Sequence, residues 1–216
     1  KVWLTSITEQ WAVLAVQGPR TRDVLDVLLD NGNRDAFSLS HMGACECEIL
    51  GVSARIFRVS FTGELGFEIN IPSGFGASLW TELERVVSAV GGCIYGTDAM
   101  HVLRAEKGYV IVGQETDGTT TAGDLGLGRM IGMNKPDFLG KRALELKEMA
   151  RDDRRQLVGL LTKKPDVVLD EGAQVTDAAE PSIGTPSLGF VSSAYFSSTL
   201  GRSIALALVA GGRERI

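Results

Sequence analysis

FRVSFTGELGFEINI, residues 57–71, carries the clearest strand pattern in this chain. Apolar and polar side chains alternate on both sides of its centre, as they do in two β-strands that each bury one face. The central residues 62–66, TGELG, include two glycines, and glycine allows the positive φ angles that a tight reversal requires. The segment therefore predicts two antiparallel strands joined by a turn.

Glu68 lies just after this turn, on the strand face opposite Phe67 and Ile69. A glutamate on the outer face of an antiparallel sheet is usually solvated. If another layer covers that face, the carboxylate must find donors, because a buried unpaired charge is very costly. A flat heterocycle with a ring N–H beside an amino group would match its two oxygens, as an arginine side chain does. The residues alone leave both interpretations open.

The chain has 216 residues, of which 44% are hydrophobic, and a net charge of −5. This length supports one large core or two modest ones. The acidic balance and the lack of basic segments interleaved with aromatic residues exclude nucleic acid as the main partner. No apolar run approaches the roughly 18 residues of a membrane span, and no signal pattern begins the sequence. We therefore expect no membrane association and a cytoplasmic location.

Three cysteines, Cys45, Cys47 and Cys93, make an odd number, which argues against a disulfide framework. The two histidines, His41 and His101, lie far apart in the sequence, so Cys45 and Cys47 lack the further ligands of a metal site. We expect no metal, and we expect the cysteines to be small buried side chains.

The order of elements predicts an α+β fold. The expected strands in the first half cover residues 11–16, 44–50, 52–61, 67–71 and 93–95. Two helices alternate with them, one from Gly18-Pro19 to Gly32 and one over residues 75–90. This β-α-β-β-β-α-β order is the split β-α-β plan with one extra strand. It predicts a ferredoxin-like antiparallel sheet with helices on one face.

A further helix is expected from Thr97 to Gly108, and another over residues 141–150. The charged run RDDRR at 151–155 then marks a domain boundary. The strands expected beyond it cover residues 156–162, 167–169, 174–176, 189–193 and 203–210. They predict a small β-barrel or sandwich. We assign residues 1–150 to a first domain that lacks its N-terminal part, and residues 151–216 to a second that is incomplete at its end.

Residues 113–132 are rich in glycine and threonine, and GDLGLG at 123–128 satisfies a loose G-x-x-G-x-G count. A nucleotide-binding loop needs a strand before it and a helix after it, and neither pattern is present. No nucleophile elbow, phosphate loop or zinc-binding helix motif occurs either, so the residues alone define no reaction.

Four segments resemble the aminomethyltransferase, or glycine cleavage T-protein, family. FTGELGFEIN at 61–70 is similar to its Y-T-G-E-x-G-x-E signature, and HVLRAEKG at 101–108 to its L-R-x-E-x-G helix. KPDFLGKRAL at 135–144 resembles F-x-G-K-x-A-L, and residues 189–209 resemble the final strands. The resemblance implies three subdomains around a channel that binds tetrahydrofolate.

The resemblance also implies the site residues. Glu68, the second glutamate of the signature, corresponds to the residue that holds the pterin, and Phe61, Glu64 and Tyr195 are the other expected folate contacts. Phe61 replaces the family's tyrosine, which keeps a ring and loses a hydroxyl. Met100 stands where the aminomethyltransferases have a folate-contacting arginine. The family's acidic residue near the reacting nitrogen is expected upstream of Lys1, so no catalytic residue is assigned in this chain.

Within the family, residues 95–119 look most like the C-terminal part of the alpha subunit of heterotetrameric sarcosine oxidases. This implies oxidation of sarcosine at a flavin elsewhere, with tetrahydrofolate held here to trap the one-carbon unit as 5,10-methylenetetrahydrofolate. The implied partners are the beta, gamma and delta subunits, with FAD, FMN and NAD on them or on other parts of the alpha chain. This polypeptide alone is then expected to be inactive in amine oxidation.

Two alternatives stay open. The first is an aminomethyltransferase of the glycine cleavage system or a related folate-dependent demethylase. The second, of another class, is a folate-binding accessory protein of iron–sulfur assembly, which KGYVIVGQE at 107–115 resembles except that it lacks that group's cysteine.

Overall fold

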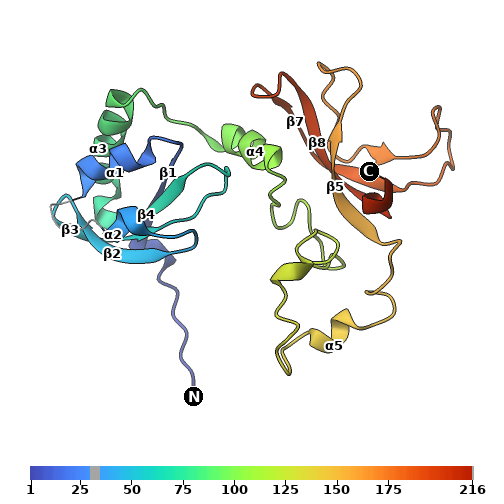
Figure 1. The fold of residues 1–216 in the computed structure, drawn as a ribbon, viewed down its shortest axis with the longest axis horizontal. Helices are drawn as coiled ribbons and strands as arrows, with labels where there is room; N and C mark the ends of the chain where they lie inside the picture. The colour runs from blue at the N-terminus through green and yellow to red at the C-terminus, as the bar shows by residue number, and fades with distance from the viewer. Residues whose placement is uncertain (30–34, 216) are drawn as a thin grey trace. The chain divides into compact units, whose positions relative to one another are not determined.

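The computed structural model describes residues 1–29 and 35–215. Figure 1 shows its helices and strands as a ribbon. Packing divides the chain into two compact units, Lys1–Met100 and His101–Ile216. Each unit contains one four-stranded antiparallel sheet, so the predicted α+β class with a helix-bearing sheet followed by a second β unit is confirmed. The boundary that the sequence predicts near residue 150 stays a prediction.

The first sheet has the strand order β1-β4-β3-β2. Its strands are β1 (Trp11–Gln17), β2 (Ala44–Ile49), β3 (Val52–Phe57) and β4 (Gly66–Pro72). The helices of this unit are α1 (Thr21–Leu28), α2 (Asp35–Ser38) and α3 (Gly76–Ala89), with 3-10 turns η1 (Thr8–Gln10) and η2 (Ser73–Phe75). Apolar residues of α1 and α3 pack with Phe67, Ile69 and Ile71 of β4 in one core. The alternation therefore places Glu68 on the sheet face away from that core, as predicted.

The turn after β3 differs in detail from the prediction. β3 ends at Phe57, because the hydroxyls of Ser60 and Thr62 donate to Gln17 Oε1 at 2.8 and 3.2 Å and draw the chain toward the end of β1. Gly63 has the expected positive φ of 79°. Gly66 has no positive φ; a Cβ there would lie 2.2 Å from Gln17 Oε1, so close approach explains its glycine.

Three further local predictions are wrong in this unit. Residues 93–95 form no strand, since glycines at 91, 92 and 96 leave three residues, too few to hold a register. Pro19 precedes α1 instead of starting it, because Arg20 is the N-cap. α1 ends at Leu28, and the predicted end at Gly32 lies outside the described residues.

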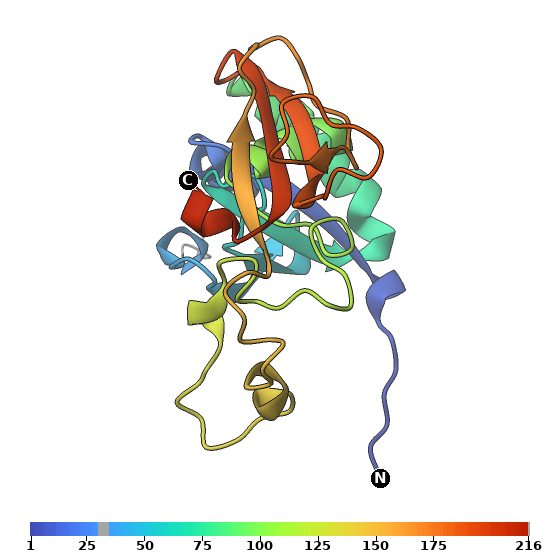
Figure 2. The same ribbon diagram turned by 90° about the vertical axis from the view of Figure 1, so that its right-hand side faces the viewer.

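The second sheet has the order β5-β8-β7-β6 and curls into part of a barrel (Figures 1 and 2). Its strands are β5 (Arg155–Leu161), β6 (Gln174–Val175), β7 (Gly189–Ser197) and β8 (Arg202–Ala210). The other elements are α4 (Thr97–Glu106), α5 (Lys141–Leu144), η3 (Gly128–Met130) and η4 (Gly212–Arg215). No helix among the described residues is long and apolar enough to cross a membrane.

Two predicted elements of this half are shorter or absent. α5 stops at Leu144, because the following charged segment has no apolar face to bury and Leu146 is 57% exposed. Residues 167–169 form no strand; the Val167 amide instead closes a local turn onto the Lys164 carbonyl.

Candidate functional site

The face of the first sheet that the helices leave uncovered, here called the open face, contains Glu68. Glu68 lies directly opposite Ala15 of β1 and Phe57 of β3. Asn70, two residues later on β4, is likewise flanked by Val13 and Arg55. Directly opposite residues share a face, so these two rows form one surface with a half-buried carboxylate at its centre.

The Glu68 carboxylate accepts no hydrogen bond from any residue in the described ranges 1–29 and 35–215. Its neighbour is Tyr95, in the segment between α3 and α4. Burial raises the pKa of the Tyr95 hydroxyl, and the Glu68 carboxylate raises it further. Tyr95 therefore keeps its proton and lies within the electrostatic field of Glu68, a proximity that strand periodicity could not reveal.

A pocket of about 440 Å³ adjoins β1 in the same unit. Its wall includes Ala15, the cross-strand neighbour of Glu68, together with Tyr95 and Met100. Much of the remaining wall is apolar and comes from β1, α3 and the following segment: Val13, Leu14, Val16, Trp80, Leu83, Val87 and Ile94. The open face and this pocket thus combine one unpartnered carboxylate with apolar surface, the composition of a small-molecule site.

The structure places the other predicted site residues as follows. Phe61 is half-buried and Glu64 is exposed, and both lie in the loop between β3 and β4 that also precedes Glu68. Tyr195 belongs to the second unit, on β7. Three of the four predicted residues therefore come from one unit and one continuous segment.

The second unit contains a buried ion pair that the sequence analysis missed. Arg104 Nη1 lies 2.8 Å from Glu115 Oε2, and both side chains are fully buried. Arg104 also donates to the Tyr109 carbonyl at 3.0 Å, and Glu115 accepts from the Ile111 amide at 2.7 Å and from Ser193 Oγ. The signal was present, because Arg104 is the arginine of the L-R-x-E segment, but its partner lies 11 residues away in a loop.

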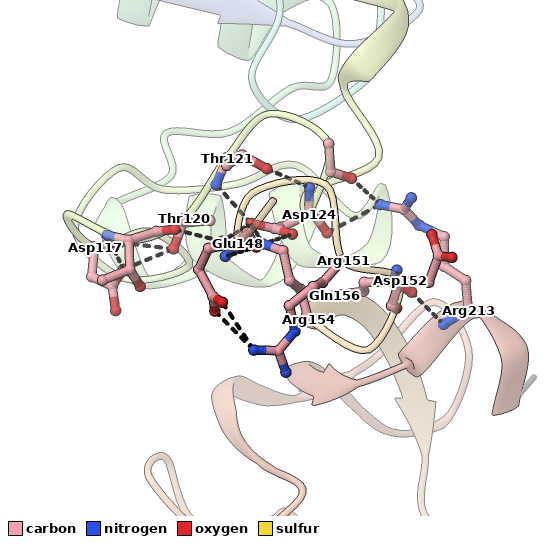
Figure 3. Close-up of polar contacts among 12 residues, drawn as sticks. Asp117, Thr120, Thr121, Asp124, Glu148, Arg151, Asp152, Arg154, Gln156 and Arg213 are labelled. Carbon is pink, nitrogen blue, oxygen red and sulfur yellow. Dashed lines mark hydrogen bonds and ion pairs between the residues drawn. The ribbon is translucent and has the colours of Figure 1, made fainter. Parts of the chain in front are cut away.

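The glycine- and threonine-rich loop is not a phosphate cradle (Figure 3). Its Thr119 and Thr121 amides donate to the carboxylates of Asp117 and Asp124, each at 2.8 Å, so these N–H groups are occupied. Arg154 donates to Asp124 at 2.7 Å and ties the loop to the start of β5. The structure therefore gives no support for a nucleotide-binding loop at residues 123–128.

These contacts set the pKa values of the two aspartates. Hydrogen bonds, first from the Thr119 hydroxyl and then from the Thr119 amide, lower the pKa of Asp117 to about 2. Burial raises the pKa of Asp124, but hydrogen bonds from Arg154 and Thr121 outweigh it, and the pKa is lowered.

Within the described part of the chain, no group of three or more His, Cys, Asp or Glu side chains could hold a metal ion. Cys47 is buried, Cys45 is half-buried and Cys93 is exposed, so the expectation of buried cysteines is wrong for Cys93, which follows a pair of glycines in a surface segment. Burial, and then the neighbouring Cys45, raise the pKa of the Cys47 thiol to about 11.

Comparison with known proteins shows the family of this chain. Residues 1–135 match the GCVT N-terminal domain, and residues 155–216 match the glycine cleavage T-protein C-terminal barrel domain. The chain belongs to the glycine cleavage T-protein family. Among its relatives, the sarcosine oxidase subunit alpha of Corynebacterium sp. (strain U-96) is 44% identical over 100% of this chain and 22% of the relative. The corresponding subunit of Rhizobium meliloti (strain 1021) is 37% identical over 99% of this chain and 22% of its own length.

Two aminomethyltransferases extend the family comparison. That of Thermotoga neapolitana is 33% identical over 96% of this chain and 54% of the enzyme. The crystal structure of glycine cleavage system aminomethyltransferase T from Bartonella henselae superposes with a TM-score of 0.74 at 27% identity, covering 94% of this chain and 52% of that one. The chain thus spans 22% of the oxidase subunits and about half of the aminomethyltransferases that it matches.

Proposed function

We propose that this chain is the folate-binding part of a sarcosine oxidase alpha subunit. In this role it holds tetrahydrofolate so that the one-carbon unit from the oxidative demethylation of sarcosine is trapped as 5,10-methylenetetrahydrofolate. The family supports a T-protein-like function, and identity to the oxidase subunits, 44% and 37%, exceeds the 33% to the aminomethyltransferase. Met100, in place of the arginine that the aminomethyltransferases carry, favours the oxidase as well.

The observation that carries the proposal is the half-buried Glu68 carboxylate, which accepts no hydrogen bond from the described residues. Two free acceptor oxygens in one plane fit a pterin edge that offers a ring N–H and an amino group. The pocket whose wall includes Ala15 and Tyr95, both neighbours of Glu68, offers apolar surface to the ligand. Glu68 and the apolar pocket therefore suit the pterin ring of tetrahydrofolate.

Each residue has a separate task in this site. Glu68 orients the pterin by accepting two hydrogen bonds and acts neither as an acid nor as a base. Phe61 offers its ring to the flat face of the ligand, and Glu64 supplies a further polar contact. Tyr195, in the second unit, is a folate contact that we propose from the family resemblance alone. Tetrahydrofolate, when bound, supplies the nitrogen atoms that take up the one-carbon unit. Holding it in place raises its effective concentration, so that the reactive unit meets it before water does.

The oxidation itself belongs to other parts of the enzyme. We assign FAD, FMN and NAD to other subunits or to other regions of the alpha chain, and we name the beta, gamma and delta subunits as partners in the cytoplasm. In this proposal, the 216 residues of this chain contribute only the folate site.

Aminomethyltransferase activity is the second candidate. The TM-score of 0.74 with the Bartonella henselae enzyme and the 54% coverage of the Thermotoga neapolitana enzyme favour it. Transfer of a one-carbon unit from an aminomethylated carrier protein to tetrahydrofolate, with no activity on sarcosine, would establish it in place of the oxidase role.

Exchange of Glu68 for Gln tests the folate site. Gln keeps the size, but its NH₂ group faces a pterin donor, so one charge-assisted pair is lost and two donors are brought together. Calorimetric titration of the intact protein with tetrahydrofolate is expected to show an affinity about 30- to 1000-fold weaker.

Glu46→Gln is the matched control, because Glu46 lies on β2, on the same open face, with its side chain 80% exposed and 3.6 Å from Arg55. Its tetrahydrofolate affinity should equal that of the wild type. A Glu68→Gln affinity within about threefold of wild type would show that Glu68 is only a solvated strand residue.

A further inference from the structure

Tyr95 is a second polar side chain beside the place proposed for the pterin, and it belongs to the same compact unit as Glu68. Ala15 of β1 lies directly opposite Glu68 on the open face. Ala15 and Tyr95 both contribute to the wall of the pocket of about 440 Å³. The carboxylate and the phenol are therefore the two polar groups that flank Ala15, and both are half-buried.

The Tyr95 hydroxyl is a neutral donor with no use inside the protein. It forms no hydrogen bond with any residue in the ranges 1–29 and 35–215. Burial, and then the Glu68 carboxylate, raise its pKa, so the hydroxyl keeps its proton at neutral pH. An arginine or lysine in this place would pair with Glu68 and occupy its oxygens. A phenol leaves the carboxylate free for a ligand.

The pterin ring requires a donor of this kind next to Glu68. The ring N–H and the amino group from which the carboxylate accepts are neighbours on one edge of the ring. The atoms on the two sides of this pair, the 4-carbonyl oxygen and the ring nitrogen N1, are both hydrogen-bond acceptors. Whichever way the ring lies, an acceptor therefore comes next to the carboxylate. Glu68 cannot donate to it, whereas a phenol can.

We propose that the Tyr95 hydroxyl donates a hydrogen bond to the pterin acceptor that adjoins the pair of groups bound by Glu68. The inference rests on the proposed folate function and adds a specificity-determining residue to it. Glu68 reads two donors of the ring and Tyr95 reads the acceptor beside them. The acceptor is either the 4-carbonyl oxygen or N1, which both take a phenol proton in the same way.

Tyr95→Phe tests the donor, because it removes only the hydroxyl. In the intact protein, calorimetric affinity for tetrahydrofolate is expected to fall about threefold to tenfold, since one neutral hydrogen bond is lost. The denaturation midpoint without ligand should not change, because the hydroxyl has no partner among the described residues. Unchanged affinity would overturn the proposal, and so would a weaker affinity that is accompanied by a lower midpoint.

Tyr109→Phe is the matched control. Tyr109 is 42% exposed, and its hydroxyl forms no hydrogen bond with the part of the chain that the structure describes. Its removal should leave the affinity for tetrahydrofolate equal to that of the wild type. An equal loss in both variants would mean that the effect does not come from the place of Tyr95 beside Glu68, and would contradict the proposal.

Two further measurements locate the hydrogen bond. In 1-deazatetrahydrofolate a C–H group replaces N1: the Tyr95→Phe loss persists with this analogue if the 4-carbonyl oxygen is the acceptor, and disappears if N1 is. In the Glu68→Gln background the Tyr95→Phe loss should shrink, because the ring is no longer held against the hydroxyl. Equal losses in both backgrounds would show that Tyr95 does not act on the edge bound by Glu68, and would contradict the proposal.

The outcomes separate this inference from the function on which it rests. If the wild-type protein does not bind tetrahydrofolate, both fail. If Glu68→Gln weakens binding while Tyr95→Phe does not, the proposed function stands and only the inference fails.

Discussion

At the scale of single residues, two glycines of the second sheet have opposite surroundings. Gly189 begins β7, and a Cβ there would lie 1.9 Å from the Leu208 carbonyl oxygen of β8. Gly159, within β5, has no heavy atom within 4 Å of that position. Identical substitutions should therefore have different effects.

We expect Gly189→Ala to lower the free energy of unfolding by at least about 3 kcal/mol, because backbone must move to admit the methyl group. Gly159→Ala should change it by less than about 1 kcal/mol, since alanine loses less entropy on folding and meets no obstacle. Denaturant titrations followed by circular dichroism measure both. Equal effects would show that β7 and β8 do not approach so closely at Gly189.

The buried pair gives a second residue-scale prediction. Glu115→Gln keeps the shape of the side chain but leaves Arg104 charged and buried, which should cost about 3–5 kcal/mol of unfolding free energy. Glu82→Gln at the exposed pair with Arg85 is the control, and it should leave the denaturation midpoint unchanged. A stable Glu115→Gln protein would mean that water reaches Arg104.

At the scale of elements, the loop that begins at Asp117 is tied down by its own carboxylates. Asp117 accepts from the Thr119 amide, and Asp124 accepts from the Thr121 amide and from Arg154. Both carboxyl pKa values are lowered, that of Asp117 to about 2. A lowered carboxyl pKa stabilises the folded loop above the unfolded pKa, about 3.9, and this stabilisation is lost as the pH falls through the folded pKa.

We therefore expect this loop to open between about pH 4 and pH 2 while it stays closed at neutral pH. Amide exchange at Thr119 and Thr121, followed by NMR across this range, measures the opening. Asp117→Asn should lower the protection of the Thr119 amide, relative to its intrinsic exchange rate, at neutral pH and make this protection nearly independent of pH. If the protection at Thr119 in the wild type were the same at pH 5 and pH 2, the carboxylate would not hold the loop.

At the scale of the whole molecule, the proposal links a folate site to an oxidation that happens elsewhere, since the chain spans 22% of the oxidase subunits it resembles. We expect Glu68→Gln in the assembled enzyme to raise the share of the one-carbon unit released as formaldehyde at the expense of 5,10-methylenetetrahydrofolate. Product analysis during sarcosine turnover, with Glu46→Gln as the control, measures this share. If the share released as formaldehyde does not change, Glu68 takes no part in trapping the one-carbon unit.

Several features follow from the sequence alone because they depend on local periodicity. The alternation over residues 67–71 determined that Phe67, Ile69 and Ile71 enter the core and that Glu68 does not, since successive strand residues point to opposite faces. Motif spacing also identified the family, as the matches over residues 1–135 and 155–216 confirm. The strand alternation and the motif resemblance together predicted Glu68 as a candidate site residue.

Other features were decided only by tertiary structure, because they join residues that no local pattern relates. Residues 93–95 are apolar enough for a strand, yet they do not pair with any described strand and form part of a pocket wall that also includes Ala15, the cross-strand neighbour of Glu68. The network of Arg104, Glu115 and Ser193 spans separations of 11 and 89 residues. Burial favours such pairing in space, and both terminal nitrogens of Arg104 have partners although its buried Nε has none.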